Sequence, residues 1–189
     1  MSDYREEIEK TIVMEDLWPS FQNPENIKEL TRLSTEVYTN ASMEGLLASI
    51  LIDQQVAEEM LRVLLKDCQL MIKISLADNA EIRFAEQKAT NFGRLIDELK
   101  KTISFEQKES FILECIELNK IRIQVVHGLG KTTDLTSIQE LAERGKKHFE
   151  KLNVLYQEAH LKFCSFFKSE QEILHFDYQV SQMQDDRGI

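Results

Sequence analysis

The chain has 189 residues with a formal net charge of −10 at pH 7, and 42% of its residues are hydrophobic. This length suits one domain that buries roughly 70% of its unfolded surface, so we expect no structural metal and no cofactor. The acidic balance argues against a broad nucleic-acid-binding face, because contacts with phosphates supply most of the affinity of such proteins. An acidic net charge is still compatible with a local basic cleft.

The composition favours a helical, reduced, cytoplasmic protein. The three cysteines, Cys68, Cys115 and Cys164, are isolated in apolar helical contexts, which is typical of buried free thiols. The first residues are charged, and no stretch approaches the roughly 18 apolar residues of a membrane span. We therefore expect no membrane partner. Only six glycines and two prolines are available for sheet turns, which predicts an all-α fold.

Residues 1–40 are expected to form an N-terminal helical segment that packs on a helical bundle. An amphipathic pattern predicts a helix over residues 2–17, which Trp18-Pro19 ends. Asn23-Pro24 has the pattern of a helix cap and first helical position, so a second helix is predicted from there to about Tyr38.

Residues 41–168 are predicted to form the helical bundle itself. Residues 42–74 carry a wide apolar face and should form a main wall of the core. Residues 81–101 hold a further helical region, in which Gly93 predicts a break or a helix start near Thr90.

A central helix is predicted from Ser104 to Gly130. Ser104 and Gln107 have the spacing of a capping box, and Gly128 can end the helix in the left-handed conformation. The apolar residues in between are spread almost all round the cylinder, and such a helix is normally buried on most sides.

The last long helix is predicted to start at a second capping box, Thr136 to Gln139. Its apolar residues then follow at steps of four and three for about four heptads, which indicates a covered seam. The row consists of Ile138, Ala142, Gly145, Phe149, Leu152, Tyr156, Ala159, Phe163 and Phe166. A helix of some 30 residues would be about 45 Å long, so we expect it to pair with the N-terminal helices or with a second subunit. Residues 169–189 are polar and are expected to form a frayed tail.

Two cationic side chains interrupt the apolar central helix. Arg122 stands among isoleucines and valines, where a guanidinium is costly to desolvate without a partner. It is therefore either paired with an acid or faces a wet cleft. Asp53, Glu58 and Glu59 on the first long helix are candidate counter-ions, although acids on helices usually face water. His127 follows Arg122 by about 140° of rotation and roughly 7.5 Å of rise, so the two could line one groove wall.

Basic residues gather in two places. The first group, Lys120, Arg122, His127 and Lys131, lies on or next to the central helix, and the second comprises Arg144, Lys146, Lys147, His148 and Lys151. We interpret the second group as a solvated helix face of mixed charge.

The motif Arg122-x-x-x-x-His127, preceded by Leu118-Asn-Lys-Ile and followed by Gly128, resembles the signature of the HEPN superfamily, the higher-eukaryote and prokaryote nucleotide-binding domains. The order of elements over about residues 42–165 is similar too: a long helix, a Phe-Gly-containing segment, the motif helix and another long helix. The resemblance implies a four- or five-helix bundle, commonly a homodimer in which the motif helices face each other.

In catalytic HEPN proteins the motif pair performs metal-independent RNA cleavage. The resemblance implies that His127 acts as general base or acid and that Arg122 stabilises charge on the phosphorane. Candidate supporting residues are Asn119, Lys120 and Asp53. A histidine at a helix C-terminus is also favoured by the helix dipole, whatever its function.

One departure from the family pattern matters for function. The position after the motif arginine is usually polar in active members, and here it is Ile123. Together with the acidic charge, this favours a non-catalytic interaction or regulatory module of bacterial type, with a protein or RNA partner. The alternative is a metal-independent endoribonuclease of toxin or defence type that uses Arg122 and His127 at a dimer cleft.

Overall fold

The computed structural model describes residues 2–21, 24–77, 79–84, 91–128 and 134–185, and within them the chain forms helices and no strand. The predicted all-α class is thereby confirmed. The elements are α1 (Ser2–Val13), the 3₁₀ helices η1 (Glu15–Leu17) and η2 (Pro19–Phe21), α2 (Pro24–Thr39), α3 (Met43–Leu76), α4 (Phe92–Lys100), α5 (Lys108–Gly128) and α6 (Leu135–Asp185).

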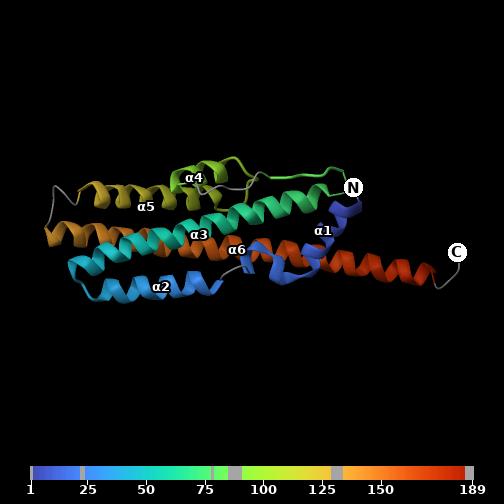
Figure 1. The fold of residues 1–189 in the computed structure, drawn as a ribbon, viewed down its shortest axis with the longest axis horizontal. Helices are drawn as coiled ribbons and strands as arrows, with labels where there is room; N and C mark the ends of the chain where they lie inside the picture. The colour runs from blue at the N-terminus through green and yellow to red at the C-terminus, as the bar shows by residue number, and fades with distance from the viewer. Residues whose placement is uncertain (1, 22–23, 78, 85–90, 129–133, 186–189) are drawn as a thin grey trace.

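The bundle is elongated and built around two long helices. Figure 1 shows α3 and α6 running beside each other, with α2 along one side of the pair and α5 along the other. The short helix α4 packs on α3 and on the half of α5 nearest Lys108, while α1 lies at the far end against α6 (Figure 1). The end of α5 at Gly128 therefore extends beyond the cover that α4 provides.

Helix α3 forms the main wall of the core, as predicted. The side chain of Ser42 caps it by accepting a hydrogen bond from the Gly45 amide. Gly45 also permits a close approach of α2, because a Cβ atom there would lie 2.4 Å from the carbonyl oxygen of Val37. The fully buried residues of the helix are Val56, Ala57, Met60, Leu61, Leu64, Asp67 and Cys68.

The apolar row of α6 is buried as predicted from Ile138 to Phe163. At its end Phe167 is fully buried and Phe166 only partly, because a 3.6-residue helix drifts away from a strict heptad repeat. Helices α3 and α5 of the same chain cover the seam. Helix α6 has 51 residues instead of the expected 30 and continues as far as Asp185, through most of the expected tail.

The predicted start of the central helix at Ser104 is wrong. Helix α5 begins at Lys108, because Gln107 has a φ of 64° and so interrupts helical geometry between Ser104 and Lys108. The buried ammonium group of Lys108 donates hydrogen bonds to the carbonyl oxygens of Lys100, Thr102 and Ile103 at 3.0–3.3 Å. The start of α5 is therefore set by its docking to the C-terminal end of α4.

The capping box predicted at Thr136 is also wrong. Helix α6 begins one residue earlier, and its cap is Asp134, whose carboxylate accepts from the amides of Thr136 (2.9 Å) and Ser137 (3.2 Å). The Ser137 hydroxyl donates to the same group at 2.6 Å. These hydrogen bonds hold the pKa of Asp134 below its usual range.

Two further boundaries differ from the predictions. Helix α1 ends at Val13 instead of Leu17, and the chain folds back so that the indole of the fully buried Trp18 donates to the Thr11 carbonyl at 3.0 Å. Helix α4 starts at Phe92 behind an Asn91 cap, which agrees with the start predicted near Thr90. Residues 81–84 are not helical, and residues 85–90 lie outside the described part of the chain.

Candidate functional site

Helix α5 has one buried stripe and one exposed face, so the prediction that it is buried on most sides is wrong. The stripe consists of Phe111, Ile112, Cys115, Leu118, Ile121 and Val125. Neighbouring helices cover only this side, and α4 covers only the half near Lys108 (Figure 1). Apolar residues further along α5 are therefore left in contact with solvent.

Arg122 and His127 both lie on the exposed face near the end of α5. Between them Ile123 is 43% exposed and Val126 is 46% exposed. Residues four apart are neighbours on a helix surface, so Arg122 lies next to Val126 and Ile123 lies next to His127. We call these four residues the motif face. It is a mixed apolar and cationic surface.

None of the predicted counter-ions pairs with Arg122. Glu58 and Glu59 both pair with Arg62 on their own helix, and Asp53 is engaged by other groups. Arg122 has no ion-pair or hydrogen-bond partner within the described part of the chain, and the same holds for His127. The predicted pairing of Arg122 with an acid is therefore not observed, and its side chain is exposed on the surface of α5.

The three candidate supporting residues do not converge on the motif pair. Lys120 is exposed and pairs with Glu117 at 2.6 Å, one turn away on the outside of α5. Asn119 is half-buried on the same helix. Asp53 is buried on α3, where it accepts a hydrogen bond from the Ser34 hydroxyl of α2 at 2.5 Å. Asp53 therefore belongs to the interior of the bundle.

The second basic group is largely matched with acids. Glu114 of α5 lies 2.5 Å from His148 and 3.7 Å from Lys151. The Lys146 ammonium lies 4.0 Å from Asp53. This agrees with a face of mixed charge, although Lys146 and His148 are half-buried and not fully solvated.

The sequence interpretation missed the most perturbed acid, Asp67. It is fully buried on α3 and accepts a hydrogen bond from the Ser20 hydroxyl at 2.7 Å. Burial raises the pKa of Asp67 to about 7 and that of Asp53 to about 6, against ordinary values near 4. The available signal was helical spacing: Leu64 and Leu70 lie three residues from Asp67 on either side, which places Asp67 on the apolar face of the helix.

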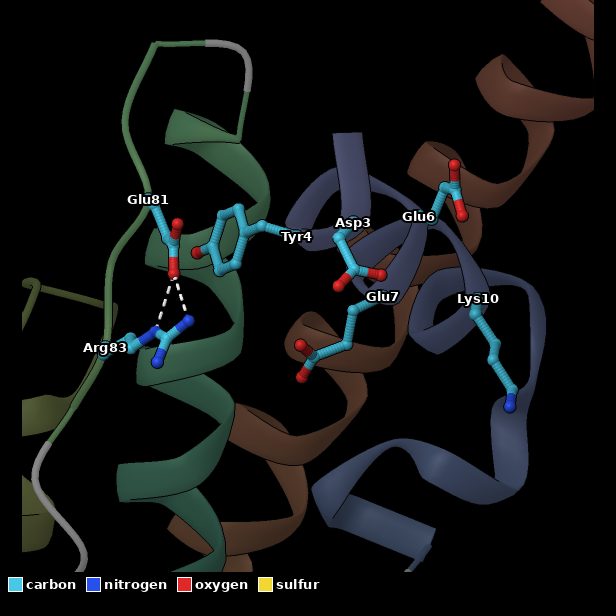
Figure 2. A pocket seen from close by; sticks show the side chains of 7 residues that line it. All are labelled: Asp3, Tyr4, Glu6, Glu7, Lys10, Glu81 and Arg83. Atoms are coloured by element: carbon cyan, nitrogen blue, oxygen red, sulfur yellow. Dashed lines mark hydrogen bonds and ion pairs between the residues drawn. The ribbon is translucent and has the colours of Figure 1, made fainter. Parts of the chain in front are cut away.

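A surface hollow of about 590 Å³ lies where α1 meets the segment after α3, lined by Asp3, Tyr4, Glu6, Glu7, Lys10, Glu81 and Arg83. Figure 2 shows Glu81 and Arg83 paired at its edge, across from the α1 side chains. Within the described residues no group of three His, Cys, Asp or Glu is placed to hold a metal ion. The hollow is lined mainly by charged side chains of both signs.

Comparison with known protein families, curated proteins and solved structures gives no match. Among the described helices, none combines the length and apolar character needed to cross a bilayer. The class that the fold and the site define is an all-α bundle with an exposed motif face at one end of α5.

Proposed function

We propose that this chain is a HEPN-like, non-catalytic interaction module that pairs with a second copy of itself through the motif face. The observation that carries the proposal is the exposure of Ile123 and Val126 side by side, flanked by the unpaired Arg122 and His127. Protein interfaces have an apolar centre and a polar rim, and arginine is enriched in them relative to the rest of the surface.

A two-fold axis beside α5 would bring the same four residues of each copy together. Ile123 and Val126 of both copies would form the apolar centre, and Arg122 and His127 would lie at its rim. Ile123, which replaces the polar residue of active family members, adds apolar area at this centre. The replacement fits association better than catalysis.

The oligomeric state tests the proposal. We expect the purified protein to sediment as a dimer and the double variant Ile123→Glu, Val126→Glu to sediment as a monomer with an unchanged melting temperature. The matched control is Val154→Glu, which places the same charge at a 57% exposed position on α6 and should leave the dimer intact. A wild-type protein that remains monomeric at high concentration would refute this function.

The second candidate function is metal-independent RNA cleavage. It is favoured by one observation: both motif side chains are exposed and unpaired within the described chain, so a bound phosphodiester could reach them. A histidine titrates near neutral pH and an arginine presents a fixed fork of donors, which suits proton transfer and phosphorane stabilisation.

Cleavage of a structured RNA pool in excess chelator separates the two functions. Activity that persists in chelator, disappears in Arg122→Ala and in His127→Ala, and survives in Lys147→Ala would establish the ribonuclease. Lys147 is the control because it is an exposed cation of the second basic group. Absence of cleavage by the folded protein would favour the interaction module.

A further inference from the structure

Two buried hydrogen bonds of the same kind join the N-terminal elements to α3. Ser20 of η2 donates to Asp67 at 2.7 Å, and Ser34 of α2 donates to Asp53 at 2.5 Å. The two serines are 14 residues apart and so are the two aspartates, in antiparallel order. None of the four residues is more than 6% exposed. The N-terminal segment, formed by α1, η1, η2 and α2, thus meets α3 at two equivalent polar contacts.

The surroundings of Asp67 do not compensate a negative charge. Its Oδ1 atom has no hydrogen-bond partner within the described residues. The titratable groups that face it are Cys68 on its own helix and Tyr156 and Cys164 on α6, which are neutral or negative. An ionised carboxylate in such a site loses its hydration and gains little in return.

The negative charge of an ionised Asp53 would be compensated in part. Lys146 of α6 lies 4.0 Å from its carboxylate, and the Ser34 hydroxyl faces it from α2. Glu150 of α6 also faces it and opposes its ionisation. Ionisation is therefore more unfavourable at Asp67 than at Asp53.

We propose that the N-terminal segment is a proton-sensitive latch, closed on α3 while Asp67 and Asp53 are protonated and loosened when they ionise. Lifting η2 and α2 away would let water reach both carboxylates, so that hydration replaces the hydrogen bonds from Ser20 and Ser34. The latch is a property of the segment's packing and is independent of the motif face.

The direction of the effect follows from proton linkage. Burial raises the pKa of Asp67 to about 7 and that of Asp53 to about 6 in the closed state, while in the open state both return towards about 4. The closed state binds more protons than the open state. The free energy by which this favours closure is therefore at its full value below about pH 4, and it is lost as pH rises through the closed-state pKa values of about 6 and about 7. For Asp67 the opening equilibrium should increase about tenfold for each pH unit between about pH 4 and about pH 6, and then level off above about pH 7.

Trp18 is a reporter within the latch. It is the only tryptophan of the chain, it is fully buried, and its ring lies 5.4 Å from that of Phe167 on α6. Acrylamide quenching of its fluorescence should increase between about pH 5 and about pH 8, while far-UV circular dichroism stays constant. Quenching that does not change with pH would overturn the latch. Helix loss that accompanies quenching would overturn it too, because the opening would then be global.

The variants Asp67→Asn and Asp53→Asn keep an acceptor oxygen for each serine but cannot ionise. The double variant should show low quenching at every pH, and an unchanged pH profile would refute the mechanism. The matched control is Asp97→Asn, an exposed aspartate of α4 that pairs with Lys100. A second control is His160→Asn, because His160 is a titratable group whose pKa is lowered by burial and its ring packs against Phe21 of η2.

Hydrogen exchange of the wild-type protein tests the latch without any substitution. After correction for intrinsic exchange rates, the amides of α1 should be less protected at about pH 8 than at about pH 6, while those in the middle of α3 should not change. Equal protection of α1 at both pH values would overturn the proposal.

Discussion

The imidazole Nδ1 of His148 lies 2.5 Å from the carboxylate of Glu114, and this contact joins α6 to α5 at a half-buried position. Lys151 approaches the same carboxylate at 3.7 Å. One acid thus serves two members of the second basic group, and a third member, Lys146, is matched by Asp53. These three side chains of α6 therefore contact acids within the fold, whereas Arg144 and Lys147 of the same group are exposed.

Glu114→Gln should destabilise the protein by about 1–3 kcal/mol, the usual effect of removing one partner from partly buried charged hydrogen bonds. Its side chain is only 17% exposed, so solvent screens the contact weakly. Urea unfolding followed by circular dichroism measures the change. Glu140→Gln, an exposed acid at the start of α6, is the control. Equal stability of the two variants would show that Glu114 is an ordinary surface acid.

Lys108→Met should destabilise the protein by about 2–4 kcal/mol, because it leaves three carbonyl groups without their ammonium donor. The apolar stem of the side chain is kept, so the change reports on the hydrogen bonds to Lys100, Thr102 and Ile103. The loss should be largest in hydrogen-exchange protection of α4. The control Lys101→Met changes an exposed lysine and should have little effect on stability or on the protection of α4. Unchanged protection of α4 would contradict the proposed docking role.

Asp134→Ala should lower the melting temperature of the protein, because it removes the cap of α6. Thr136→Ala should lower it much less, since the Thr136 amide is a donor in the cap and its exposed side chain is not the acceptor. Thermal unfolding of the two variants therefore distinguishes the observed cap from the capping box predicted at Thr136. A larger loss in Thr136→Ala would reverse the assignment.

The scarcity of glycine and proline was sufficient to predict the all-α class. Hydrophobic spacing was sufficient to predict the buried row of α6, because burial of an amphipathic helix depends on a repeat that the sequence displays. The helix starts were harder. The pattern Ser104 to Gln107 satisfies the capping-box rule, yet Lys108 begins the helix since it must reach the carbonyl groups at the end of α4. That requirement comes from tertiary packing and has no local signal.

The candidate site was predictable in its residues but not in its environment. Arg122 and His127 stand out in the sequence, whereas their exposure depends on how far α4 extends along α5 (Figure 1). Asp53 was considered as a partner for Arg122, and its actual partner is Ser34 of α2. Asp67 resembles any acid on a helix until Ser20 is placed against it. Serine partners contributed by another helix cannot be inferred from spacing.

Phe149→Asp should unfold the protein or destabilise it by at least about 3 kcal/mol, because it removes a large core side chain and buries a charge. Phe149 is 2% exposed in the seam of α6, which helices of the same chain cover, so the effect should be loss of folding and not a change of oligomeric state alone. Phe163→Asp should act in the same way. The control Val154→Asp lies at an exposed position of the same helix. Thermal melting and sedimentation decide the matter: a Phe149→Asp protein that melts like the wild type but sediments differently would show that the seam is an intersubunit contact.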